Sequence, residues 1–171
     1  MILEFCPVKI KMILEIGVGN KKIFENSIAI DIRNTSEVNI IGDACKLPFR
    51  DGSFDYIYSA HTIEHFSHME VKYVLKEWIR VLKSGGTLEL RCPDLQMRCF
   101  LFFLRPSWND VKNIYGGQDY PQNFHKCGFS YILLKRHLNA LGIVKIKRIL
   151  DGYKGIPLIP CDLHILGIKR K

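Results

Sequence analysis

The stretch ILEIGVGN, Ile13 to Asn20, has the pattern of a short buried strand that runs into a glycine turn. Glycine at positions 17 and 19 lets backbone N–H groups approach a ligand closely. A turn of this kind typically holds a nucleotide-like ligand at the end of a parallel strand. Two glycines alone are a weak signal, so the rest of the sequence must indicate which ligand is held.

Apolar, β-rich segments alternate with helical or irregular segments along the chain. This alternation predicts a mainly parallel sheet with crossover connections. The expected strands are MILEI (12–16), SIAID (27–31), VNIIG (38–42), FDYIYS (54–59), TLELRC (87–92), GIVKIKRI (142–149) and DLHILGI (162–168).

Two helices are expected between these strands. Ser67 and Glu70 have the spacing of a capping box, and apolar residues then recur at helical spacing over 71–82. A glycine pair beyond that segment is the stop signal. The second helix is expected over 131–141, ended by Gly142. Residues 93–129 are the least regular part, and such segments tend to be functional.

The bulk composition is that of one soluble globular domain, 1–171, with 47% apolar and 25% charged residues. The longest apolar runs, such as CFLFFL (99–104), are far shorter than the roughly 20 residues of a membrane helix. Glu4 and Pro7 interrupt the N-terminal apolar residues, so no signal peptide is expected. Six cysteines without a CxxC pair predict reduced thiols and a cytoplasmic protein.

The net charge of +8 lies in the second half of the chain. Residues 1–85 hold 11 basic and 11 acidic residues, whereas residues 86–171 hold 14 basic and 6 acidic residues. A basic half favours an anionic partner such as RNA or a membrane surface. A solvated lysine-rich surface is the alternative, because no block of five basic residues occurs.

A dinucleotide site fits the glycine turn poorly. Such a site needs GxGxxG and an acidic residue about 20 positions further on. Here Lys22 occupies the place of the third glycine, and Asp31 follows Gly19 after only 12 residues. Asp31 and Asp43 instead end successive strands, where one carboxylate can accept two ribose hydroxyls and the other an adenine amine.

The order of these segments resembles the class I S-adenosylmethionine-dependent methyltransferases. The matching segments are ILEIGVGN, IAIDIR, GDACKLPFRDGSFDYIYSAHTIEHF and VLKSGGTLELRCPDL, and the C-terminal part looks like that family's last helix and closing hairpin. The resemblance implies a Rossmann-like α/β fold with a mainly parallel seven-stranded sheet of order 3-2-1-4-5-7-6. It also implies an antiparallel last strand and helices on both faces.

A narrower resemblance, carried by GVGN and a later YGGQ…FHKCGF, is to small predicted methyltransferases of the type-11 kind, often linked to polysaccharide assembly. The family likeness implies that S-adenosylmethionine is the cofactor. The residues that it assigns to cofactor binding are Glu15, Gly17, Gly19, Asp31, Asp43, Ala44 and His61.

Histidines and a glutamate follow the fourth expected strand. His61, Glu64 and His65 have i, i+3, i+4 spacing, and His125 comes later. The pattern resembles the metal-dependent O-methyltransferases of ubiquinone biosynthesis and of small RNAs, which implies a divalent transition metal on these four residues. The alternatives are His61, His65 or His125 as a catalytic group without metal, or a purely structural helix start.

The function expected is methyl transfer to oxygen on a small acceptor, perhaps a sugar or glycan precursor, with residues 93–129 binding the acceptor. The alternatives are RNA 2′-O-methylation and a non-catalytic cofactor-binding subunit. The segment MRCFLFFLRPSW (97–108) has two explanations: a buried helix or homodimer contact, or a surface helix at an anionic membrane.

Overall fold

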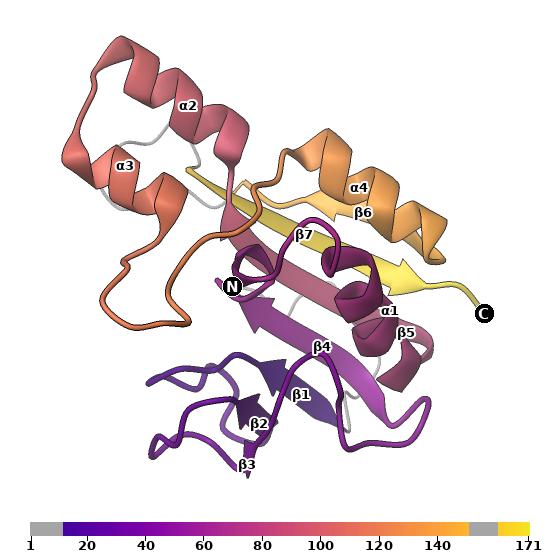
Figure 1. The fold of residues 1–171 in the computed structure, drawn as a ribbon. Coiled ribbons are helices and arrows are strands. Elements are labelled where there is room, and N and C mark those ends of the chain that lie inside the picture. Colours follow the sequence, from indigo (N-terminus) through magenta and orange to yellow (C-terminus); the bar gives the residue numbers. More distant parts are fainter. Residues whose placement is uncertain (1–11, 151–160) are drawn as a thin grey trace.

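A seven-stranded sheet of order β3-β2-β1-β4-β5-β7-β6 runs through the computed structural model, which describes residues 12–150 and 161–171 (Figure 1). Parallel pairing joins all neighbours from β3 to β5, and β7 pairs antiparallel with both β5 and β6. The predicted order and the antiparallel last strand are therefore confirmed. The strands are β1 (Ile13–Ile16), β2 (Ile28–Asp31), β3 (Ile40–Ile41), β4 (Phe54–Ala60), β5 (Leu82–Pro93), β6 (Ile143–Arg148) and β7 (Asp162–Lys169).

Two helices, α1 (Val71–Val81) and α4 (Tyr131–Ala140), lie over one face of the sheet (Figure 1). Alternate strand residues such as Leu14, Ile57 and Leu88 form one core with the apolar sides of these helices. Period-2 burial in strands and period-3.6 burial in helices produce this layer arrangement. No helix among the described residues lies between β1 and β2 or between β2 and β3.

The expected helix starts and stops are only partly observed. Glu70 accepts a hydrogen bond of 2.8 Å from the Ser67 N–H, but α1 begins at Val71. The chain enters β5 directly at Leu82, so the glycine pair lies inside a strand instead of ending the helix. The expected α4 is confirmed within one residue, with Ser130 as its cap and Gly142 beyond it at φ +88°.

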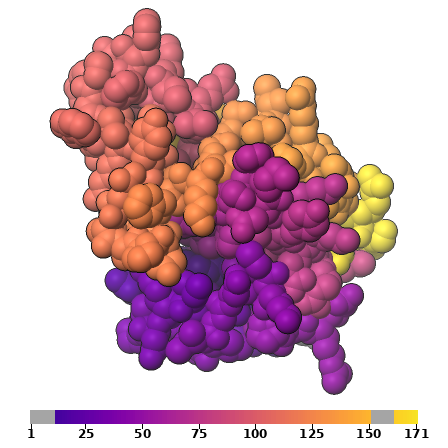
Figure 2. Space-filling model, in the orientation of Figure 1, coloured from indigo at the N-terminus to yellow at the C-terminus, as the bar shows by residue number. Residues whose placement is uncertain are grey.

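Residues 93–129 contain two helices that the sequence did not delimit, α2 (Leu95–Leu104) and α3 (Trp108–Tyr115). The two helices form a lobe that stands out from the body of the molecule (Figures 1 and 2). An irregular segment then returns from this lobe to α4 and passes the carboxyl end of the sheet.

Candidate functional site

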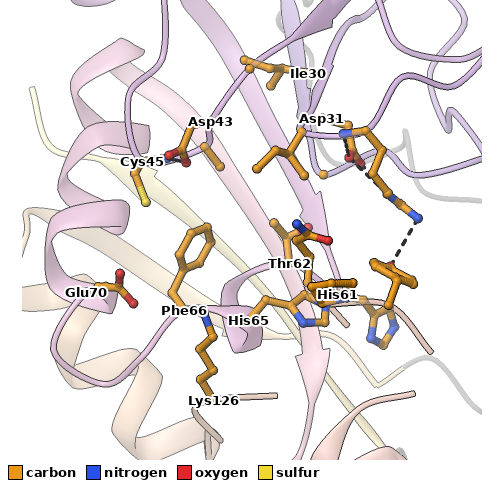
Figure 3. Close-up of a pocket in the computed structure, with 18 residues that line it drawn as sticks. Ile30, Asp31, Asp43, Cys45, His61, Thr62, His65, Phe66, Glu70 and Lys126 are labelled. Carbon is orange, nitrogen blue, oxygen red and sulfur yellow. Dashed lines mark hydrogen bonds and ion pairs between the residues drawn. The ribbon is translucent and has the colours of Figure 1, made fainter. Parts of the chain in front are cut away.

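A cavity of about 400 Å³ lies at the carboxyl ends of β1, β2, β3 and β4. This is the edge of an open parallel sheet where ligands bind. Figure 3 shows Asp31 and Asp43 on one side of the pocket and His61, His65 and Phe66 on the other. Residues 120–122 and Lys126 complete its wall.

The turn after β1 needs its glycines for two different reasons. Gly17 has φ +71°, and a Cβ there would lie 2.0 Å from Thr62 Oγ1. Gly19 has φ +62°, and its N–H donates a 2.8 Å hydrogen bond to Asp31 Oδ2. Gly17 lines the cavity, whereas Gly19 acts beside it by holding Asp31.

Glu15, which the family likeness assigns to cofactor binding, is not among the residues that line the cavity. Its side chain is 1% exposed and accepts hydrogen bonds from the backbone N–H groups of Ile23 and Phe24, and from the Ser27 hydroxyl. These hydrogen bonds to the Glu15 carboxylate tie the 17–27 loop to β1. That loop replaces a crossover helix.

Asp31 is bound by neighbours as well as open to the cavity. Its Oδ1 accepts a 2.8 Å hydrogen bond from the Arg33 backbone N–H, and the Arg33 guanidinium lies 3.3 Å from the same oxygen. Burial would raise the pKa of Asp31, but the hydrogen bonds from Arg33 and Gly19 hold it below its usual value. Arg33 also reaches Tyr120, which it contacts both at the hydroxyl (3.2 Å) and over the ring (5.3 Å).

The Asp43–Ala44 segment is positioned by the core. The buried Trp78 of α1 donates a 2.9 Å hydrogen bond from its indole N–H to the Ala44 carbonyl. Asp43 is exposed, and one of its carboxylate oxygens accepts a 2.8 Å hydrogen bond from the Cys45 N–H. Burial and the Asp43 charge raise the pKa of Cys45 to about 12, so this thiol is neutral at physiological pH.

Several cavity residues were not identified from the sequence. Ile32 is 56% exposed although apolar, and it lines the cavity directly after Asp31. Phe66 and Thr62 lie on the opposite side (Figure 3). An apolar residue directly after a strand-end acid is the signal that could have indicated Ile32.

His61 occupies a strained position at the exit of β4. Its φ is +52°, a region that non-glycine residues rarely adopt outside sites where surrounding structure imposes it. Its ring lies 3.5 Å from Asp162 and 3.3 Å from Glu64. These two carboxylates, Asp162 foremost, raise the pKa of His61 to about 10, so the ring is an imidazolium at neutral pH.

Glu64, His65 and His125 converge beside the cavity, with ligand atoms within 4.8 Å of one another. His65 Nδ1 lies 3.1 Å from the Phe124 carbonyl, and His125 Nδ1 lies 3.1 Å from the Asn113 carbonyl. A carbonyl only accepts, so both Nδ1 atoms carry the proton when the rings are neutral, and both Nε2 atoms have a free lone pair. Burial lowers the pKa of His125, although Glu64 opposes this shift.

The Glu64 carboxylate is 1% exposed, and neither oxygen has a hydrogen-bond partner within the described residues. The His61 ring at 3.3 Å supplies charge, but not a well-aligned hydrogen bond. The His61 imidazolium supplies a positive charge beside this buried carboxylate, while both carboxylate oxygens stay without a hydrogen bond from the described residues and are free to bind an ion. The donor set of one carboxylate and two imidazoles therefore fits a divalent transition metal, with His61 beside the group instead of within it.

The sequence-predicted residues thus divide into three groups. Gly17, Asp31, Asp43, Ala44, His61 and His65 line the main cavity. Glu64 and His125 line a small adjoining cavity, while Glu15 and Gly19 support the turn from behind.

Comparison with protein families places residues 15–90 in a methyltransferase domain family. A demethylmenaquinone methyltransferase of Listeria monocytogenes is 34% identical over 98 residues, which are 57% of this chain and 35% of that protein. The ajmaline N-methyltransferase of Rauvolfia serpentina is 44% identical over 48 residues, 28% of this chain and 16% of that protein. The chain therefore spans about a third or less of these curated relatives.

Solved structures share the whole fold at low sequence identity. A methyltransferase from Methanosarcina mazei has a TM-score of 0.64 at 19% identity, covering 93% of this chain and 92% of that chain. One from Archaeoglobus fulgidus has a TM-score of 0.62 at 17% identity, covering 94% and 87%. Residues 15–90 match the model of the methyltransferase domain family, and the chain has the fold of the S-adenosylmethionine-dependent methyltransferases with solved structures.

Proposed function

We propose that the chain transfers the methyl group of S-adenosylmethionine to a small-molecule acceptor. The observation that carries the proposal is the cavity at the carboxyl ends of the first four strands, with Asp31 and Asp43 facing it. Asp31 would hold the ribose hydroxyls, Asp43 the adenine amine, and Ile32 one face of the base. The Gly17 turn would contact the methionine part.

Methyl transfer is an in-line displacement at a sulfonium, so the protein mainly positions the two reactants. The C–S bond breaks as the bond from methyl carbon to acceptor forms, and S-adenosylhomocysteine leaves. We favour an oxygen acceptor, for example on a sugar, whose hydroxyl proton must be removed. The methyltransferases with similar sequences are named for different acceptors, so this finer assignment rests on the histidines beside the cavity.

His125 is the base in a metal-free form of the reaction. Its Nδ1–H is held by the Asn113 carbonyl, which leaves Nε2 as the atom that accepts a proton. His65, whose Nδ1 is held in the same way, lies with its ring 5.1 Å from that of His125. The acceptor would enter along residues 93–129, of which 120–122 and Lys126 line the cavity.

A second candidate is metal-assisted methylation, favoured by the buried Glu64 carboxylate, whose oxygens accept no hydrogen bond within the described residues. Glu64, His65 and His125 would hold the ion, and an ion there would polarise an acceptor hydroxyl and ease its deprotonation. Transition metals such as Zn, Fe, Ni or Mn suit imidazole ligands better than Mg does.

Metal analysis distinguishes the metal-free reaction, with His125 as base, from the metal-assisted reaction. Protein purified without a histidine tag should contain near-stoichiometric transition metal if the second form is right, and His65→Ala should remove it. His137→Ala is the matched control, because His137 lies on α4 away from the cluster. If wild-type protein holds no metal after incubation with each ion and His125→Ala still abolishes turnover, the base form stands.

Calorimetry with S-adenosylmethionine, S-adenosylhomocysteine and NAD tests the proposed cofactor. Heat with the first two ligands and none with NAD is expected. Methyl transfer from labelled cofactor is then screened against hydroxylated small molecules, sugars among them, and against RNA. Transfer to RNA alone would replace the proposal by 2′-O-methylation. Tight cofactor binding with no transfer to any acceptor class would favour the non-catalytic subunit.

A further inference from the structure

The lobe formed by α2 and α3 presents several large apolar side chains to solvent. Phe103 is 82% exposed and Trp108 is 87% exposed, and neither helix buries any apolar residue. We call the exposed residues the apolar lobe surface; they are Cys99, Phe100, Phe102, Phe103, Leu104 and Trp108. The alternative of a buried helix for the segment 97–108 is therefore wrong.

The orientation of α2 is held by polar contacts at its base. The one buried residue of α2 is Arg98, whose guanidinium lies 3.1 Å from Asp162 of β7. Asp94 caps the helix by accepting from the Met97 N–H, and Arg148 lies 2.8 Å from the same carboxylate. A helix that buries its arginine and exposes its phenylalanines reverses the usual preference of soluble proteins.

The charges around the apolar lobe surface are mainly positive. Arg105 and Lys112 are exposed beside it. The acidic Asp110 is engaged by the Ser107 hydroxyl. Apart from the buried Arg98, residues 95–115 hold two basic residues and one acidic residue. Exposed aromatic side chains flanked by basic residues match the chemistry of an anionic bilayer interface, where tryptophan and arginine lie at the headgroups.

The size of the surface favours lipid over a second copy of the chain. Its four aromatic side chains expose about 500 Å² at typical aromatic areas. A stable protein interface buries about 800 Å² on each partner. A patch of a few hundred Å² is the size of a functional surface on a monomer. No helix in the described part of the chain is long and apolar enough to span a bilayer.

We propose that the apolar lobe surface docks on anionic lipid bilayers, with Phe103 and Trp108 inserted at the headgroup boundary and Arg105 and Lys112 against the headgroups. The lobe is joined to the site, because the carbonyls of Asn113 and Tyr115 in α3 accept hydrogen bonds from His125. Resting on the proposed function, docking would deliver an amphiphilic acceptor to the cavity wall at 120–126.

Flotation with vesicles tests the docking directly, without cofactor or acceptor. Wild-type protein should bind vesicles containing phosphatidylglycerol and bind pure phosphatidylcholine much less. Raising salt from about 0.05 M to about 0.5 M should release it, because the Debye length shortens. Replacing Arg105 and Lys112 together by Gln should weaken binding about 10-fold or more, since each surface charge contributes on the order of 1 kcal/mol.

The double substitution Phe103→Glu, Trp108→Glu should abolish vesicle binding. Both side chains are more than four-fifths exposed, so circular dichroism and the melting temperature should match wild type. Tyr73→Glu is the matched control, because Tyr73 is 72% exposed on α1 and should leave vesicle binding intact. S-Adenosylmethionine affinity of the double variant should be unchanged, which separates this inference from the proposed cofactor site.

Two results would overturn the inference. One is wild-type protein that stays with the unbound fraction at low salt. The other is a double variant that binds vesicles as well as wild type does, which would reduce the attraction to charge alone. Analytical ultracentrifugation tests whether a second copy of the chain covers the surface instead. If the wild type is a dimer that does not bind vesicles and the double variant is a monomer, the surface is a dimer interface.

Discussion

The indole N–H of Trp78 lies 2.9 Å from the carbonyl oxygen of Ala44, so a wholly buried side chain of α1 holds the segment proposed to bind adenine. The hydrogen bond spans 34 residues of sequence. It joins the hydrophobic core to the rim of the cavity. Removing this hydrogen bond should therefore lower both the stability of the fold and the affinity for the cofactor.

Trp78→Phe should therefore weaken S-adenosylmethionine binding about 2–10-fold, the range for loss of one neutral hydrogen bond. Leu75→Val is the matched control, because it removes a buried methylene from the same helix without touching a polar group. The control should lower the free energy of unfolding but not the affinity. Calorimetry and urea unfolding of both variants measure the two effects, and equal affinity in Trp78→Phe would contradict the link.

Asp43→Ala and Asp31→Ala should each weaken cofactor binding about 10–100-fold, because each removes charge-assisted hydrogen bonds. Only Asp31→Ala should also lower the melting temperature, since Asp31 holds the N–H groups of Gly19 and Arg33. Asp43 is exposed, so its loss should leave the melting temperature nearly unchanged. Unchanged affinity in both variants would exclude the proposed cofactor site.

The lowered pKa of Asp31 predicts a pH dependence of stability. A carboxyl whose folded pKa lies below its unfolded value stabilises the fold above the unfolded pKa, and this contribution is lost as pH falls through the folded pKa. Below about pH 4 the wild type should therefore lose stability more steeply than Asp31→Asn. Parallel curves of unfolding free energy against pH would show that Asp31 makes no such contribution.

Glu15→Gln should destabilise the protein by about 1–3 kcal/mol, because the new amide cannot accept from both backbone N–H groups of the loop. Cofactor binding should weaken as well, since the same loop continues from the Gly17 turn. Glu25→Gln, an exposed change in the same loop, is the control and should behave as wild type. A wild-type midpoint for Glu15→Gln in urea would refute the structural role.

Gly17→Ala should lower both stability and cofactor affinity, because the added Cβ would meet the Thr62 side chain and because φ is positive. Combining it with Thr62→Gly should restore part of the lost stability, since the clash is relieved while the backbone strain remains. Thermal melts of the single and double variants measure this. If Thr62→Gly restores no stability, the whole loss of stability in Gly17→Ala comes from the strained backbone and not from the clash.

Strand positions and sheet order were predictable because buried parallel strands leave continuous apolar segments in the sequence. The end of α1 was placed within one residue, but the cause was misassigned, because Gly85 and Gly86, read as its stop signal, lie within β5. Asp31 and Asp43 could be placed at one edge from topology alone. The roles of Glu15 and Asp162 depend on side-chain direction and on the register of β7 against β5, which no local pattern contains.

The cofactor side and the acceptor side of the cavity differ in the sequence separation of the residues that form them. The contact between the Gly19 turn and Asp31 joins residues 12 apart, whereas the contact of His61 with Asp162 of β7 joins residues 101 apart (162 − 61). Loop closure costs more entropy for longer loops, so nearby pairings form sooner. By this entropy argument we expect the contacts of the Gly19 turn to form before β7 docks. His61 gains its Asp162 partner only when the last strand is added, which makes β7 docking the step that completes the acceptor side.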